Sequence, residues 1–376
     1  MAYDHIVPQV YLKRWTFNPG KTSLYKLDKQ TGQYYQRSKD KVGGKRSAYH
    51  LKLFVDLTDE DFDFVNYYIE QYYELFPNCF TEIEGFLSNY TFELDGKNIT
   101  NSKEKLLIIK TAIISKDSNL VKRNYIIDQV SKLWASSEAY DFIEKALHDV
   151  EDEWEENSNN ILAQLTLTNS CAIDLQNHDQ IAKFISIQCL RNSEERTQKK
   201  AIAETFKIVN ELVEPLNMNF VPTNDMYYSA WLLNTIKSFL GIKNSENKNT
   251  LSSIENAFYN NCFFYMRAVG TKKFITCDNP VVAERINQKG LFVFPISPSV
   301  CVLVCSYPEA RNDFKLKATD IIVDYYNSLI YENAIKEAYS IDKSFTYKKR
   351  SIPKTEIRKM WNDVGLEYWG DLKINQ

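Results

Sequence analysis

Hydrophobic positions repeat with two different periods along the first hundred residues. Residues 22–37 alternate apolar and polar on both sides of a Lys-Gln-Thr-Gly turn, which predicts a β-hairpin. Over residues 58–76 apolar side chains recur every three or four positions, which predicts a helix that ends before a proline. A second, short helix is expected around residues 80–87, and another hairpin around the Asp-Gly pair at 95–96.

The middle of the chain has a helical pattern. Apolar residues from Tyr140 to Trp154 step by three and four, and the residues between them are mostly charged. The acidic run HDVEDEWEE at 148–156 is therefore expected to be a solvated helix face and not a metal site. The asparagines of 157–160 are predicted to break this helix, and a long helix is expected from about 174 to 213.

Strand patterns return after residue 255. The segment 261–278 is predicted to form a strand, a Gly-Thr turn and a second strand, and 290–305 to form another pair around Ser-Pro-Ser. Helices are expected at about 318–340 and 353–365. The pattern indicates an α+β fold that is predominantly helical, with an antiparallel sheet formed by the N-terminal hairpin and the hairpins of the C-terminal half.

The length of 376 residues is compatible with one elaborated domain or with two closely packed ones. We predict a single domain over residues 1–376 with four consecutive parts. These parts are the N-terminal segment and hairpin (1–56), a helical region (57–255), the antiparallel strands (256–310) and the C-terminal helices (311–376).

Composition and charge narrow the class of protein. With 44% hydrophobic and 25% charged residues, the chain has the composition of a globular protein. The net charge of −3 provides no long-range attraction for nucleic acid, so such binding needs a local basic patch. Residues 336–359 contain one: Lys and Arg outnumber acids there and alternate with aromatic residues, so this stretch is a candidate contact for nucleic acid or nucleotide. A solvated loop and helix face is the alternative interpretation.

Several site classes and compartments are disfavoured. No stretch is long and apolar enough to span a bilayer and the N-terminus does not resemble a signal peptide, so we expect a cytoplasmic protein without a membrane partner. The seven cysteines are scattered and are expected to be free thiols. With four histidines and no Walker, zincin, nucleophile-elbow or kinase motif, we expect no metal and no cofactor. The sequence does not indicate an oligomeric state.

Three polar residues interrupt apolar helix faces. Gln188 and Arg191 continue the stripe set by Ile181 and Phe184, and Asn327 falls within a stripe on a later helix. A buried amide or guanidinium without a hydrogen-bond partner lowers the stability of the folded state by roughly several kcal/mol. These side chains therefore need partners.

Two further polar candidates have competing interpretations. Asp278 and Asn279 precede a proline and end a predicted strand, so they form either an ordinary Asx-type turn or part of a site. His5, close to the N-terminus, either hydrogen-bonds a strand end or belongs to the same site.

Four motifs resemble those of one protein family. DHIVPQVYLKRW resembles the His-x-x-Pro-Gln-x-Tyr-Leu opening of the domain-of-unknown-function 4238 proteins of prokaryotes. FISIQCLRNSEER is similar to that family's Gln-x-x-Arg helix, FITCDNPVV to its Thr-x-Asp-Asn-Pro strand end, and LFVFPISPSVCVLV to its Phe-Pro-(Leu/Ile)-Ser-Pro hairpin. The resemblance implies a one-piece fold in which these segments meet, with Tyr11, Leu12 and Trp15 as core anchors. It implies one site containing His5, Gln9, Gln188, Arg191, Asp278, Asn279 and Asn327.

Two functions fit this set of residues. In an enzyme, His5 is the general acid or base, Asp278 tunes it, and Arg191 holds an anionic group such as a phosphate. Substrate binding then falls to Gln9, Gln188, Asn279 and Asn327, and the reaction is phosphodiester hydrolysis or phosphoryl or nucleotidyl transfer. In a non-catalytic interaction module, the same residues form a buried structural network. We favour an intracellular enzyme acting on nucleic acid or nucleotide, and the genome neighbourhoods of such families associate it with defence against phage or mobile elements.

Overall fold

The computed structural model describes residues 3–5, 7–17, 20, 22–46, 59–109, 112–114, 120–167, 172–173, 178–191, 232–233, 235–242, 258, 261–286, 289–305 and 313–366. The chain divides into two compact units. Unit 1 comprises residues 1–48, 149–192 and 253–376, and unit 2 comprises residues 49–148 and 193–252. The single domain with four consecutive parts stays a prediction.

Unit 2 contains helices and a small sheet. Its elements are α2 (Asp59–Leu75), α3 (Thr81–Ser88), β5 (Phe92–Leu94), β6 (Lys97–Ile99), α4 (Ser102–Leu107), β7 (Ile113–Ile114) and α5 (Leu120–Ala135), with strand order β6-β5-β7. The predicted helices at 58–76 and 80–87 and the hairpin at 95–96 are confirmed. An aromatic cluster of Tyr72, Phe80 and Trp134 packs between α2, α3 and α5.

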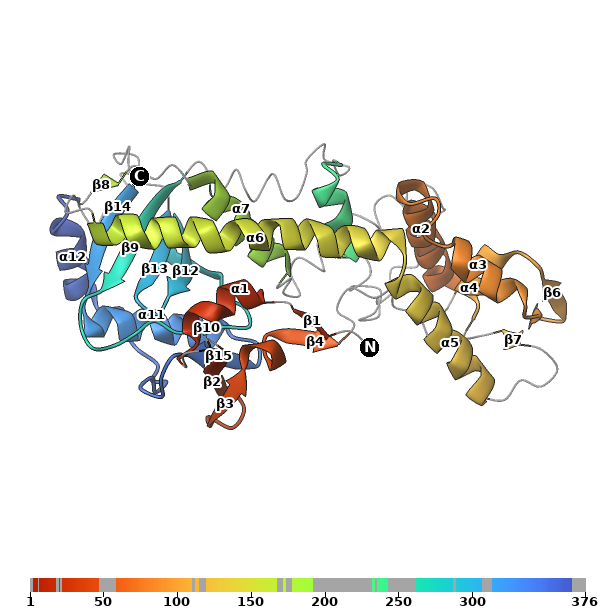
Figure 1. The fold of residues 1–376 in the computed structure, drawn as a ribbon, viewed down its shortest axis with the longest axis horizontal. Coiled ribbons are helices and arrows are strands. Elements are labelled where there is room, and N and C mark those ends of the chain that lie inside the picture. Colours follow the sequence, from red (N-terminus) through yellow and green to blue (C-terminus); the bar gives the residue numbers. More distant parts are fainter. Residues whose placement is uncertain are drawn as a thin grey trace. The chain divides into compact units, whose positions relative to one another are not determined.

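Unit 1 is built around two sheets (Figure 1). The four-stranded sheet has the order β10 (Thr276–Cys277), β15 (Glu337–Ser340), β2 (Ser23–Asp28), β3 (Tyr34–Ser38), and all its pairs are antiparallel. The six-stranded sheet has the order β11 (Val282–Ile286), β12 (Lys289–Ser297), β13 (Val300–Cys305), β9 (Cys262–Ala268), β14 (Asp313–Ala318), β8 (Ala172–Ile173). Only β9 and β14 pair in parallel among these described strands. The predicted α+β class is confirmed.

The main core of unit 1 lies between the six-stranded sheet and the helices α11 (Asp320–Asn333) and α12 (Lys354–Asn362). Buried Phe264, Leu303 and Leu316 of the sheet belong to the same cluster as Val323 of α11 and Trp361 of α12. Each such side chain stabilises the fold by about 1.5–3 kcal/mol when fully buried. The helix predicted at 353–365 is confirmed in α12.

Two predicted boundaries in this half were wrong. Segment 261–278 is not a hairpin, because β9 and β10 belong to different sheets. The helix predicted over 318–340 ends at Asn333, and residues 337–340 form β15, which pairs with β2. The hairpin predicted at 290–305 is confirmed as β12 and β13.

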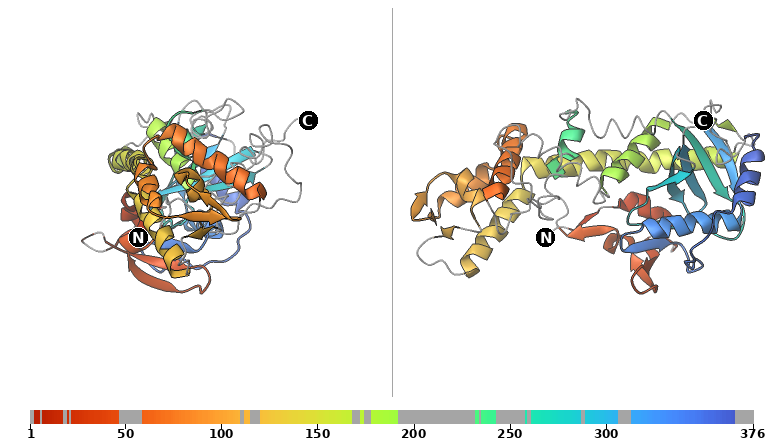
Figure 2. Two further views of the ribbon diagram at one scale, coloured as in Figure 1. Left: turned by 90° about the vertical axis from the view of Figure 1, so that its right-hand side faces the viewer. Right: turned by 180° about the vertical axis from the view of Figure 1, so that it is seen from behind.

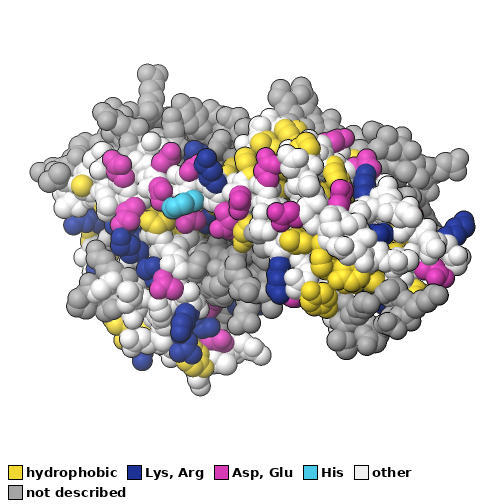
Figure 3. All heavy atoms as spheres, turned by 45° about the vertical axis from the view of Figure 1, so that its right-hand side comes forward, with side chains coloured by type: hydrophobic (Ala, Val, Ile, Leu, Met, Phe, Trp, Pro, Cys, Tyr) yellow, Lys and Arg dark blue, Asp and Glu magenta, His cyan; other side chains and the backbone are white. Residues whose placement is uncertain are grey.

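Helix α6 (Glu138–Leu167) runs through residues 157–160, so the predicted break was wrong. Arg14 Nη2 donates to Ser158 Oγ (2.7 Å) and Asn159 Oδ1 (2.8 Å), and Asn157 and Ser158 are buried. These tertiary contacts compensate for the low helix propensity of asparagine and serine. Figure 3 shows acidic side chains gathered around a histidine, and most acids of run 148–156 are exposed, as predicted.

Helix α7 (His178–Arg191) is the described part of the helix predicted over 174–213, and residues 192–213 lie outside the described residues. No helix of the described part of the chain is long and apolar enough to cross a membrane. The six described cysteines are free, and the described residues contain no group of three or more His, Cys, Asp or Glu suited to a metal ion.

Candidate functional site

Tyr11 lies where four distant segments of unit 1 meet. It belongs to α1 (Gln9–Leu12), and its hydroxyl donates to Pro295 O (2.7 Å) in β12. Because the phenol proton is used there, the Thr276 hydroxyl of β10 donates to the Tyr11 oxygen (2.7 Å). The Tyr11 ring also packs on Phe294 and on Phe184 of α7. Burial raises the pKa of Tyr11 well above its usual value, so this phenol stays a donor.

The residues next to Tyr11 fix the opening segment. Leu12 and Trp15 are fully buried, and Trp15 Nε1 donates to Phe274 O (3.2 Å). The predicted core role of Tyr11, Leu12 and Trp15 is confirmed. Lys13 of the 3₁₀ turn η1 (Lys13–Trp15) forms an ion pair with Glu155 of α6.

Helices α6 and α7 pack antiparallel in unit 1, and Figure 2 shows them side by side. Trp154 of α6 stacks on Phe184 of α7 with ring centroids 3.9 Å apart. About two turns farther along α7, Arg191 Nη2 forms an ion pair with Oε1 of Glu151, which lies three residues before Trp154 on α6. Gln188 lies between these two contacts on the same face of α7, and its side chain is fully buried.

Five buried polar atoms of this helix pair have no hydrogen-bond partner within the described structure. They are Trp154 Nε1, Gln188 Nε2, Gln188 Oε1, Arg191 Nε and Arg191 Nη1. The side chain of Arg191 is 3% exposed, whereas that of Glu151 is 24% exposed. Four of the five atoms are nitrogens that donate hydrogen bonds. The side chains of Glu151, Trp154, Gln188 and Arg191, which we call the α6/α7 cluster, therefore offer an arginine charge and more donors than acceptors.

Asp278 has its hydrogen bonds supplied by the backbone. Its carboxylate accepts from the N–H groups of Ile335 (2.8 Å), Lys336 (2.8 Å) and Glu337 (3.2 Å). Burial raises the pKa of Asp278, and these three backbone hydrogen bonds act in the opposite direction. The carboxylate thus holds the turn between α11 and β15, which explains why the helix stops at Asn333.

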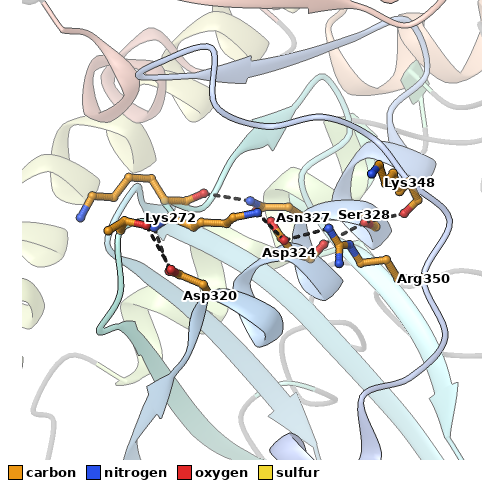
Figure 4. Close-up of polar contacts among 9 residues, drawn as sticks. Lys272, Asp320, Asp324, Asn327, Ser328, Lys348 and Arg350 are labelled. Atoms are coloured by element: carbon orange, nitrogen blue, oxygen red, sulfur yellow. Dashed lines mark hydrogen bonds and ion pairs between the residues drawn. The ribbon is translucent and has the colours of Figure 1, made fainter.

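Asn279 and Asn327 also have their partners within the fold. Asn279 Nδ2 donates to Asn333 O (3.3 Å), and Asn333 Nδ2 donates back to Asn279 O (2.6 Å). Asn327 accepts from Ile275 N (3.0 Å) and donates to Lys273 O (2.8 Å), as seen in part in Figure 4. Both amides attach the segment between β9 and β11 to α11.

The remaining predicted residues lie near the N-terminus. Gln9 Oε1 accepts from Lys39 Nζ (2.8 Å). His5 ends β1 (Tyr3–His5), whose backbone pairs with β4 (Gly44–Arg46), and the His5 side chain lies outside the described structure. Within the described part of the chain, no hydrogen bond or ion pair joins any two of Gln188, Arg191, Asp278, Asn279 and Asn327. The common site of all seven residues stays a prediction.

A family model described as "Protein of unknown function (DUF4238)" matches residues 3–344. The chain belongs to this family. The match to the DUF4238 model spans all four motifs on which the resemblance rested. Tyr11 of the first motif contacts one residue in each of the other three: Phe184, Thr276 and Pro295. No curated protein and no solved structure matches the chain.

Two members of the α6/α7 cluster of this DUF4238 chain were missed by the sequence analysis. Glu151 and Trp154 both belong to a helix that was divided into an apolar stripe and a solvated acidic face. Glu151 lies four residues after Leu147 and three before Trp154, so its position at the edge of the stripe was a usable signal.

Proposed function

We propose that this DUF4238 protein binds a phosphate-containing ligand, such as a nucleotide or nucleic acid, at the α6/α7 cluster and acts on it as a hydrolase or transferase. One observation carries the proposal: the five unpartnered buried atoms of Trp154, Gln188 and Arg191. Leaving a buried donor unpaired is unfavourable by about 1–3 kcal/mol for each group. A ligand with several acceptor oxygens removes this penalty.

The chemistry of the cluster suits a phosphate group. Arginine forms charge-assisted hydrogen bonds to phosphate oxygens, and these bonds are stronger than neutral ones. The Gln188 amide and the Trp154 indole N–H add neutral donors, and Gln188 Oε1 adds an acceptor for a hydroxyl or base N–H group. Glu151 occupies only one nitrogen of Arg191.

In this proposal His5 remains the general acid or base, and Asp278 holds the fold. Both oxygens of the Asp278 carboxylate accept backbone hydrogen bonds from the turn at 335–337, which supports a structural role for Asp278. The reaction takes place in the cytoplasm, and its cellular role is in defence against phage or mobile elements.

The second candidate is the non-catalytic module with a structural polar network. The observation in its favour is the full set of partners of Asp278, Asn279 and Asn327. For the α6/α7 cluster, this candidate requires that ordered water alone satisfies the buried atoms.

The test compares two buried amides with different surroundings. In Gln188→Leu, an unpartnered amide is replaced by an apolar side chain of similar size, so we expect unchanged or higher thermal stability. In Asn327→Leu, the matched control, Ile275 N–H and Lys273 C=O lose their partners, so we expect a loss of about 2–4 kcal/mol. Calorimetric titration with inorganic phosphate and with nucleotides should give at least tenfold weaker binding in Gln188→Leu than in the wild type.

The outcomes separate the two candidates. A Gln188→Leu protein that is stable and has lost phosphate binding supports the ligand site. An absence of phosphate and nucleotide binding by the wild type, together with a destabilised Gln188→Leu, supports the structural module. For catalysis, His5→Ala should lower turnover of nucleotide or nucleic-acid substrates by about 10²–10⁴-fold while phosphate binding persists. Plaque counts on cells expressing the wild type or Gln188→Leu test the defence role.

A further inference from the structure

Residues 343–359, which we call the basic segment, carry most of the positive charge at the C-terminal end of the described chain. Its cations are Lys343, Lys348, Lys349, Arg350, Lys354, Arg358 and Lys359. Its only acidic residue is Glu356, which is half-buried. The first part of the segment, residues 343–353, has no regular secondary structure, and the second part belongs to helix α12.

Three contacts hold residues 343–353 against the rest of unit 1. Tyr34 donates to Phe345 O (2.6 Å), and Ser328 Oγ of α11 donates to Lys348 O (3.2 Å). Arg350 forms an ion pair with Asp324 (2.8 Å), whose carboxylate also binds Lys272 (Figure 4). The main chain is fixed at these points, so the neighbouring lysine side chains start from an ordered backbone.

The lysines of the basic segment are available to a ligand. All five are exposed, and no ion pair within the described structure involves them. Lys343 Nζ lies over the Tyr25 ring, 5.1 Å from its centroid, so the ligand charge falls mainly to Lys348, Lys349, Lys354 and Lys359. On α12 the apolar face formed by Ile357, Met360 and Trp361 is buried, which leaves Lys354 and Lys359 on the exposed side. Asp324 lies nearby, but it is already paired with two cations.

An exposed aromatic ring lies among these cations. Tyr347 is 38% exposed, and one side of its ring stacks on Tyr331 with centroids 4.8 Å apart. Its hydroxyl donates to Glu332 (2.8 Å), which fixes the ring orientation. A ring held in this way, next to Lys348 and Lys349, combines a stacking surface with phosphate-binding charge.

We infer that the basic segment binds single-stranded nucleic acid, with its lysines on the phosphates and Tyr347 stacked on a base. Non-specific single-strand sites combine these two elements. A duplex keeps its bases stacked and does not offer one to Tyr347. The inference does not depend on catalysis at the α6/α7 cluster, because the two sets share no residue.

The test is fluorescence anisotropy of the full chain with labelled 20-nucleotide single-stranded DNA and RNA at several salt concentrations. Lys348→Glu/Lys349→Glu should weaken binding at least tenfold and reduce the salt slope by about 1.4, since each phosphate contact contributes about 0.7. Tyr347→Ala should weaken binding about fivefold or more without changing the slope. Lys97→Glu/Lys145→Glu, which alters two exposed lysines of unit 2 and changes the net charge equally, is the matched control.

The results decide between specific and general electrostatic binding. Loss of binding in the basic-segment variant with retention in the control supports the inference. Equal losses in both double variants, equal affinity for a duplex of the same sequence, or no binding by the wild type at 50 mM salt overturns it. Calorimetric titration of Lys348→Glu/Lys349→Glu with inorganic phosphate should give the wild-type affinity, so a failure of the phosphate site is distinguishable from a failure of this surface.

Discussion

At the scale of single residues, hydrogen-bond partners separate polar side chains that have the same sequence character. Gln188 and Asn327 are both amides within apolar helix stripes, and both are buried. Asn327 has a partner for its oxygen and for its nitrogen, whereas Gln188 has none within the described structure. The fold therefore supplies the partners of Asn327, whereas the burial of Gln188 requires a ligand or water.

Glu151 offers a test at this scale. Its carboxylate pairs with Arg191 Nη2, next to the Nε and Nη1 atoms that we propose bind a phosphate. We expect Glu151→Gln to lower the free energy of unfolding by about 2 kcal/mol, less than for a fully buried pair because Glu151 is partly exposed. In calorimetric titrations it should bind inorganic phosphate about tenfold more tightly, because the repulsion between carboxylate and phosphate is removed.

Phosphate should therefore restore the melting temperature of Glu151→Gln more than it raises that of the wild type. Glu153→Gln makes an equal charge change at an exposed position of the same helix. It should change neither the free energy of unfolding nor the affinity for phosphate appreciably. Weaker phosphate binding in Glu151→Gln would contradict the repulsion between carboxylate and phosphate and leave Glu151 as a residue that positions Arg191.

At the scale of elements, α11 organises its surroundings through a polar row. Asp320, Asp324 and Asn327 follow one another at four and three residues and bind the loop between β9 and β10. Asp320 accepts from Lys272 N (2.9 Å) and from Thr271 Oγ1 (3.0 Å). At Gly270 a Cβ atom would lie 2.1 Å from Asp320 Oδ1, so any side chain there would displace the Asp320 carboxylate from the loop.

Asp320 gives a pH-dependent prediction. The backbone hydrogen bond from Lys272, followed by other contacts with the loop, lowers its pKa below the usual 3.8. Its stabilising effect is therefore complete above pH 3.8 and is lost as the pH falls through the lowered value. In urea unfolding, Asp320→Ala should be about 1–2 kcal/mol less stable than the wild type at pH 7.

This difference between Asp320→Ala and the wild type should shrink as the pH is lowered below 3.8. Asp149→Ala, which removes an exposed acid of α6, serves as the control and should change stability by less than about 0.5 kcal/mol at pH 7. A difference that stays constant between pH 7 and pH 3 would mean that the carboxylate charge does not stabilise the loop.

At the scale of the whole molecule, the first residues of the chain complete the core of unit 1. Tyr11, Leu12 and Trp15 are fully buried. The Tyr11 hydroxyl forms hydrogen bonds with β10 and β12, and the Trp15 indole donates to the loop before β10. The opening motif is thus part of the fold and not an appended segment.

Deletion of residues 1–16 should strongly destabilise unit 1, because three large buried side chains, each worth about 1.5–3 kcal/mol, together contribute an amount comparable with the roughly 5–15 kcal/mol stability of a typical domain. Near-ultraviolet circular dichroism and hydrogen exchange in β9, β12 and β13 measure the effect. Phe17→Ala, which removes an exposed aromatic ring that stacks on Tyr25, should leave the hydrogen exchange of these strands unchanged. Native protection of these strands in the truncated protein would contradict the assignment.

Local spacing and short motifs were enough to predict the secondary-structure periods, the α+β class, the family and the buried anchors. Which polar residues have hydrogen-bond partners became clear from the three-dimensional contacts alone. The folded structure continued α6 through 157–160 by contacts from Arg14, ended α11 through Asp278, and separated β9 from β10 into two sheets. Each of these outcomes depends on a hydrogen-bond partner far away in the chain, which local periodicity cannot specify.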